Sequence, residues 1–123
     1  MVMIEFKEGV VLRKWTEPID WMIACLKKVD GTPGFPKTLV VTSINDGEHS
    51  VKPPSRHYTD EAIDVRSHDF ETIELKTEFI NTYRRHLNSF PAKRLNAFFL
   101  ILEDQGTPNE HFHIQVNKGQ TYP

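Results

Sequence analysis

The run at residues 111–116, which reads HFHIQV, restricts the fold more than any other feature of the chain, because polar and apolar residues alternate strictly along it. A β-strand sends successive side chains to opposite faces of its sheet. The pattern therefore predicts a strand with Phe112, Ile114 and Val116 in the core. The two histidines and Gln115 are expected together on the other face, which indicates a functional surface.

Hydrophobic periodicity predicts two main helices, at residues 18–29 and 70–88. Runs rich in β-branched or aromatic residues predict three further strands, at residues 38–44, 62–66 and 95–102. Clusters of proline and glycine punctuate these segments without dividing the chain. The sum is an α+β domain in which two helices pack on a mostly antiparallel sheet.

Length, composition and charge exclude several classes of protein. With 123 residues, 38% hydrophobic and 26% charged, the chain is expected to form a single domain over residues 1–123. Lys and Arg number 15 against 17 Asp and Glu, so the basic surplus typical of nucleic-acid binding is missing. No apolar run approaches the roughly 18 residues that cross a bilayer, so membrane insertion is not expected. Nothing in the pattern predicts an oligomeric state.

The number of cysteines and the first residues of the chain indicate the cellular compartment in which the protein is made. The single cysteine, Cys25, excludes an intramolecular disulfide, and its apolar helical surroundings favour a buried position over a nucleophile. The first eight residues lack the apolar stretch of a signal peptide. We therefore expect synthesis in the cytoplasm, and any action outside it would need a separate release factor.

His57, Asp64 and His113 form a candidate metal site. His57 and Asp64 flank one short segment, seven residues apart, while His113 stands on a separate strand that can pair alongside it. Catalytic zinc takes three protein ligands and leaves a fourth position for water, and a mixed set of imidazole and carboxylate suits it. Each residue alone is more often a surface, cap or turn residue, so the prediction rests on the three together.

The stretch from Ser55 to Arg66, SRHYTDEAIDVR, resembles the Ser-x-His-x-x-Gly-x-Ala-x-Asp signature of the D-alanyl-D-alanine carboxypeptidase and Hedgehog-type zinc peptidases. A second landmark of this family, an acid three residues before the last metal-binding histidine, is similar to Glu110 before His113. The two motifs cover about a sixth of the chain. The resemblance implies the peptidase-like fold, and small family members are often phage-encoded enzymes that cleave peptidoglycan peptides.

The resemblance also implies roles for single residues. It makes His57, Asp64 and His113 the Zn²⁺ ligands and Glu110 the general base that takes a proton from zinc-bound water. His111 competes for the catalytic role, because in relatives that end in His-x-His the first histidine lies beside the metal. Strand alternation places His111 next to His113 but turns Glu110 to the opposite face unless a loop holds it. Both residues are candidates.

Two departures from the family pattern affect the expected substrate. Asp60 stands where the family has glycine, although Asp tolerates the left-handed backbone region better than most residues. The arginine that many relatives carry ahead of the first ligand is absent from residues 42–47, which favours an endopeptidase over a strict carboxypeptidase. Arg56 or Arg66 could replace that charge, although a surface position is the simpler interpretation for either. Candidate substrate contacts near the first ligand are Ser55, Arg56 and Tyr58.

Two functional hypotheses follow from these patterns. The first is a zinc metallopeptidase that cleaves peptidoglycan peptide bonds, as a D-Ala-D-Ala carboxypeptidase or as an endopeptidase. The alternative is a non-catalytic metal-binding module of the same fold, in a structural or binding role, which Asp60 and the missing arginine favour. A phage tail or assembly component that shares the fold is a third idea, supported only by the small size of the chain.

Overall fold

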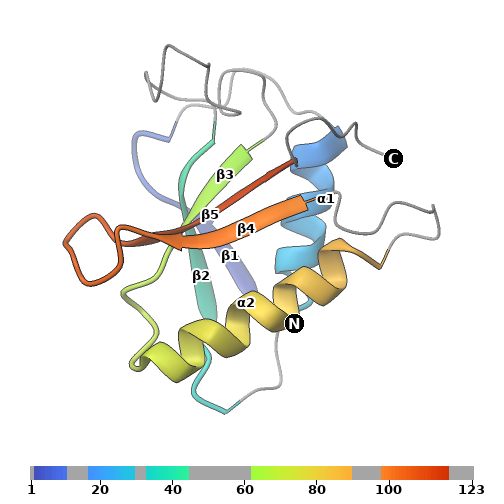
Figure 1. Ribbon diagram of the computed structural model, residues 1–123. Helices are drawn as coiled ribbons and strands as arrows, with labels where there is room; N and C mark the ends of the chain where they lie inside the picture. Colours follow the sequence, from blue (N-terminus) through green and yellow to red (C-terminus); the bar gives the residue numbers. More distant parts are fainter. Residues whose placement is uncertain (1, 11–16, 30–32, 45–61, 90–97, 117–123) are drawn as a thin grey trace.

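The computed structural model describes residues 2–10, 17–29, 33–44, 62–89 and 98–116. Its elements, in chain order, are β1 (Met3–Phe6), α1 (Glu17–Leu26), β2 (Thr38–Ser43), β3 (Ala62–Arg66), α2 (Ile73–Leu87), β4 (Phe98–Glu103) and β5 (His111–Val116) (Figure 1). The expected α+β class is confirmed. Within the described ranges, neither helix has the length and apolar character needed to cross a bilayer.

The five strands form one mixed sheet in the order β1-β2-β3-β5-β4. β1 runs parallel to β2, and the other three neighbouring pairs are antiparallel. The prediction of a mostly antiparallel sheet is therefore confirmed. No sequence pattern predicted β1, since three of its four side chains are exposed and no buried face marks it.

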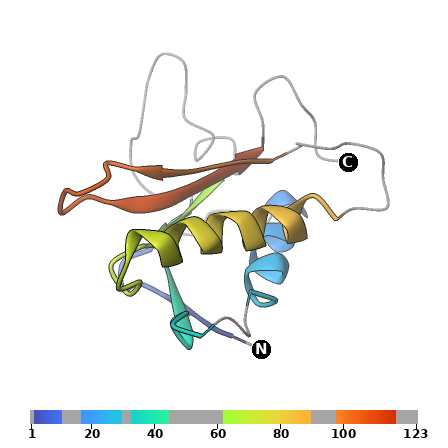
Figure 2. The same cartoon turned by 60° about the horizontal axis from the view of Figure 1, so that its bottom comes forward.

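Both helices pack against one face of the sheet, where Figure 2 shows α2 running alongside β4 and β5. The helices are tied to each other by three hydrogen bonds, one of which the Cys25 thiol donates to the His86 carbonyl at 3.4 Å. The Tyr83 hydroxyl donates to the Met22 carbonyl at 2.8 Å, and the Trp21 indole nitrogen donates to the Leu87 carbonyl at 3.0 Å. The apolar side chains of β3 and β5 join this core, so their polar side chains lie on the opposite face.

Phe79 of α2 lies at the centre of an aromatic cluster that joins the helix to β5. Its ring centroid is 4.5 Å from that of Phe112, 5.0 Å from that of Phe70 and 5.5 Å from that of Tyr83. Phe79, Phe112 and Tyr83 are fully buried. This packing fixes the position of β5, the strand that carries both histidines of the HFHIQV run.

Several element boundaries differ from the predicted ones. α2 begins at Ile73 rather than residue 70, because the Thr72 hydroxyl caps the helix by accepting from the Leu75 amide at 3.1 Å. α1 ends at Leu26 rather than residue 29. β4 extends to Glu103, one residue beyond the predicted strand. The last difference matters most, because it brings a carboxylate alongside β5.

Candidate metal centre

β5 alternates as the sequence predicts. Phe112 and Ile114 are fully buried among the core residues, while the polar side chains of the strand lie on the opposite face of the sheet. The same face of the neighbouring strand β3 carries Asp64, which is paired in register with His113. Two segments far apart in the sequence therefore meet at the centre of the sheet.

Asp64 and His113 are in direct contact. The Asp64 Oδ1 atom lies 2.9 Å from the His113 Nδ1 atom, and each residue is only 8% exposed. Two of the three metal ligands expected from the sequence thus come together. The remaining sequence-predicted site residues near the first ligand lie outside the described residues: Ser55, Arg56, His57, Tyr58 and Asp60.

His111 joins this pair. Its Nε2 atom lies 3.7 Å from Asp64 Oδ1, and one ligand atom each of Asp64, His111 and His113 all lie within 4.8 Å of one another. The Nδ1 atom of His111 is 2.7 Å from the Asn109 carbonyl oxygen, which can only accept a hydrogen bond. Nδ1 therefore donates, which leaves Nε2 of the neutral ring as the metal-binding or proton-accepting atom.

The donor set fits a small divalent cation. Around a tetrahedral zinc, bond lengths of about 2.0–2.2 Å place ligand atoms roughly 3.3 Å apart, so the three side chains need only small shifts to close on an ion. The hydrogen bond between Asp64 and His113 would have to open. Two imidazoles and one carboxylate can also bind other divalent metals. The cluster therefore indicates a metal-binding site but does not specify the metal.

Glu103 brings a second carboxylate to the cluster. It is paired in register with His111, and its Oε1 atom lies 3.4 Å from His113 Nδ1 and 3.7 Å from His111 Nε2. The predicted strand ended at residue 102, so Glu103 was not among the expected site residues. The signal that would have found it is the two-residue period of β4, which places Ile101 and Glu103 on the same face once the strand is extended by one residue.

His113 is held in a strongly polar environment. Burial opposes its positive charge, but hydrogen bonds to Asp64 and to Gln115, together with the charges of Asp64 and Glu103, outweigh burial and raise the pKa of His113 above its ordinary value. The Nε2 atom lies 2.7 Å from the Gln115 side-chain oxygen. A metal ion that binds this imidazole would therefore have to displace a proton.

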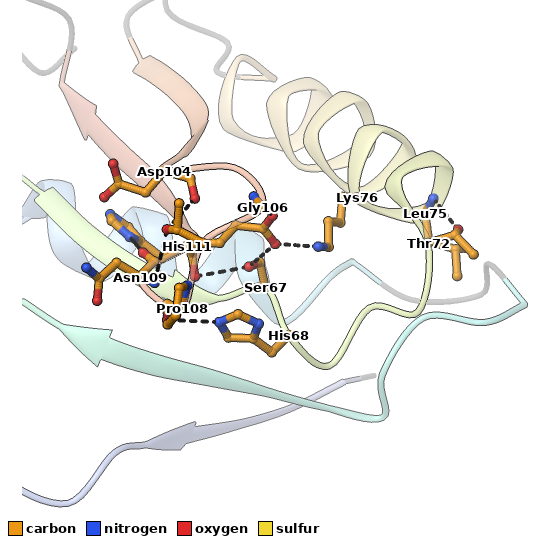
Figure 3. A network of polar contacts seen from close by, with 12 residues as sticks. Ser67, His68, Thr72, Leu75, Lys76, Asp104, Gly106, Pro108, Asn109 and His111 are labelled. Atoms are coloured by element: carbon orange, nitrogen blue, oxygen red, sulfur yellow. Dashed lines mark hydrogen bonds and ion pairs between the residues drawn. The ribbon is translucent and has the colours of Figure 1, made fainter.

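Glu110 is buried on the side of the sheet that α2 covers. Its Oε1 atom accepts from the Ser67 hydroxyl at 2.7 Å and forms an ion pair with Lys76, and its Oε2 atom accepts from the Gly106 amide at 2.9 Å. Figure 3 shows Lys76 of α2 and Ser67 turned toward the loop that contains Gly106. Burial raises the pKa of Glu110, but these donors and the Lys76 charge dominate and lower it to about 2.

Glu110→Gln is expected to lower the free energy of unfolding by about 3 kcal/mol at neutral pH, because Lys76 loses its buried carboxylate partner. The folded pKa of about 2 lies below the ordinary 4.5, so this stabilisation is present above pH 4.5 and is lost as the pH falls toward 2. Denaturant titrations of both proteins over this range measure the difference. The difference in the free energy of unfolding should shrink in acid, and a difference independent of pH would contradict the ion pair. Glu78→Gln, which changes an exposed acid of α2, is the control.

The chain was compared with family models, curated proteins and solved structures. No family model matches it, and neither a curated protein nor a solved structure matches it. The function is therefore inferred from the geometry of the cluster and from the motifs in the sequence.

Proposed function

We propose that the protein is a zinc-dependent peptidase, of the D-alanyl-D-alanine carboxypeptidase and Hedgehog type, that cleaves peptide bonds in peptidoglycan. One observation carries the proposal. Asp64 and His113 belong to the two separate motifs of the resemblance, and they lie 2.9 Å apart on adjacent strands. This contact supports the proposal, because the resemblance requires both residues at one metal ion.

Asp64 and His113 would provide two of the zinc ligands. The motif supplies His57 as the third, and the described geometry supplies His111. A bound zinc would acidify a water molecule and polarise the scissile carbonyl. If His57 completes the ligand set, His111 is left beside the site with its Nδ1 atom fixed by Asn109, so that Nε2 can accept a proton from the nucleophile.

We assign the general-base role to His111 rather than Glu110. The Glu110 carboxylate already accepts from Ser67, Lys76 and Gly106. With a pKa of about 2 it is a poor proton acceptor near neutral pH. Glu110 would have to break its ion pair with Lys76 to reach a substrate, whereas His111 already lies in the cluster. In this proposal Glu110 anchors the loop that precedes β5.

Two alanine variants test the ligand assignment. We expect about one zinc per wild-type chain. His57→Ala should lose both the metal and muropeptide cleavage, while His111→Ala should keep the metal and lose cleavage by about a hundredfold or more. Metal analysis and cleavage rates are measured on the same preparations, with His86→Ala on α2 as the control. A metal-free His57→Ala protein that still cleaves would refute the peptidase proposal.

A non-catalytic metal-binding module is the second candidate. The observation in its favour is the presence of four potential ligands in the described cluster, because Glu103 lies beside both histidines. Four protein ligands close a zinc site and leave no position for water, as in structural zinc sites. X-ray absorption on the zinc-loaded protein separates the two candidates. An ion with a bound water supports the peptidase, and an ion held by four side chains supports the module.

Glu103→Gln is expected to weaken zinc binding by about tenfold, because it removes a negative charge that lies within 4 Å of both histidines. The dissociation constant is measured by competition with a chelator of known affinity. Glu5→Gln on β1 is a matched exposed control and should leave the constant unchanged. Equal dissociation constants for wild type and Glu103→Gln would show that the carboxylate does not act on the metal.

A further inference from the structure

A cavity of about 310 Å³ lies directly beside the candidate metal site formed by Asp64, His111 and His113. Asp64 and His111 belong both to its lining and to the cluster, so the cavity and the candidate metal position share a wall. The volume is at the lower end of the range for small-molecule sites and suits one or two amino-acid residues. Whatever occupies it would therefore lie next to the reacting bond.

Two segments, β3 and the residue that follows β1, bring basic side chains to this cavity. The Lys7 amide donates to the Val41 carbonyl at 2.8 Å, which continues the alignment of β1 with β2. Arg66 is paired in register with His111 and shares the face of β3 that carries Asp64. Lys7 and Arg66 both line the cavity, together with Thr42 and His68.

The charge of the cavity favours an anion. Lys7 and Arg66 are basic side chains, whereas the two described acids of the lining, Asp64 and Glu110, are engaged by His113 and by Lys76. A divalent ion on the cluster would add further positive charge. The nearest Asp69 oxygen is 4.0 Å from the Arg66 guanidinium, and both side chains are more than a third exposed. Such a pair is weak, so Arg66 can bind another anion.

The lining is also mostly polar, which favours a polar occupant. Pro108 is the one apolar residue among the described residues that line the cavity. The hydroxyl of Thr42 and the imidazole of His68 add polar groups near the two cations. The Nε2 atom of His68 is 3.3 Å from the Pro108 carbonyl oxygen and donates to it, so the ring is held against the loop before β5.

We propose that this cavity binds a carboxylate on the substrate residue next to the scissile bond, with Arg66 and Lys7 as its partners. The inference rests on the proposed peptidase function and specifies its substrate class. The carboxylate is either the C-terminal α-carboxylate of the peptide or the free carboxylate of a D-glutamyl residue. Arg66 presents a planar pair of donors that matches a carboxylate, and Lys7 adds a second charge. A substrate carboxylate therefore has partners even though no arginine precedes the first motif.

Two matched pairs of peptides test the proposal on the full-length, zinc-loaded protein. One pair is a D-Ala–D-Ala peptide with a free or an amidated C-terminus, and the other is an L-Ala–γ-D-Glu peptide with the D-Glu α-carboxylate free or amidated. In one of the two pairs, we expect kcat/KM for the peptide with the free carboxylate to exceed that for its amidated partner by about ten- to a hundredfold. That pair identifies which substrate carboxylate the cavity binds. Equal kcat/KM within both pairs would overturn the proposal.

Variants assign the preference to the cavity. Arg66→Gln should reduce the carboxylate preference to less than about threefold while the zinc content is unchanged. Lys7→Met should reduce the preference partly. Arg66→Lys should retain part of the preference that Arg66→Gln loses. Arg85→Gln and Lys27→Met, which change exposed cations away from the cavity, are the matched controls. A full preference in both Arg66→Gln and Lys7→Met would overturn the assignment.

Calorimetric titration with reduced-amide analogues of the same peptides separates the two proposals, because it needs no turnover. If no peptide is cleaved but the carboxylate analogue binds at least about tenfold more tightly than the amide in wild type and equally in Arg66→Gln, the cavity assignment stands and the peptidase proposal fails. If peptides are cleaved but both analogues bind equally, the peptidase proposal stands and the cavity assignment is overturned.

Discussion

Under the proposed function, His113→Ala is expected to remove the bound zinc ion and abolish peptide cleavage. The His113 imidazole contacts Asp64 at 2.9 Å and lies 3.4 Å from a Glu103 oxygen, so it occupies the centre of the cluster. Without it, zinc content should fall from about one to below about 0.1 per chain, and kcat/KM should fall by at least about a thousandfold. Metal analysis and cleavage of a muropeptide substrate measure the two effects.

Controls separate loss of the metal from loss of the fold. His86→Ala removes an imidazole from α2 and should leave metal content unchanged. Asp64→Asn keeps the shape of the other central ligand but removes its charge, and it should weaken zinc binding while circular dichroism stays native. A folded His113→Ala protein that retains one zinc per chain would show that the ion is held elsewhere, and the metal centre described above would be wrong.

Phe79→Ala is expected to have the largest effect on stability, a loss of about 4 kcal/mol in the free energy of unfolding. Phe79 is fully buried, and its ring packs against Phe70, Tyr83 and Phe112. Truncation removes these contacts and leaves a cavity between α2 and β5. Urea unfolding followed by fluorescence measures the change, provided that the slope of the transition is unchanged.

The matched control for this prediction is Phe99→Ala. Phe99 lies on β4 and is 40% exposed, so its truncation should cost less than about 1 kcal/mol. If Phe79→Ala and Phe99→Ala have similar effects, α2 does not pack on β5 as described. A destabilised Phe79→Ala protein should also bind zinc more weakly, because α2 fixes the strand that carries His113.

Strand alternation predicted a large part of the site. The two-residue period of β5 is local information, and it correctly separated Phe112 and Ile114 from the polar face. The contact between Asp64 and His113 could not be predicted from strand alternation. Periodicity gives no register between distant strands, and only the resemblance to zinc peptidases linked the two residues before the structure paired them.

The surroundings of Glu110 could not be predicted in the same way. Spacing from His113 made Glu110 a candidate base, but its partners Ser67 and Lys76 come from the end of β3 and from α2. Such contacts depend on how the elements pack, and neither propensity nor periodicity contains them. Glu103 was missed for a simpler reason, since the end of a strand is the least certain part of a sequence-based prediction. β1 was missed because its exposed side chains give no signal.

The order of the strands makes some residues of the candidate metal site more rigid than others. Asp64 and His113 lie on β3 and β5, each bonded to neighbours on both sides, whereas within the described residues β4 has a neighbour on one side only. Backbone amides of β4 should therefore exchange with solvent deuterium before those of β3 and β5. Local fraying would then move Glu103 while Asp64 and His113 stay in place, which gives an incoming ion a route past Glu103 to a rigid pair.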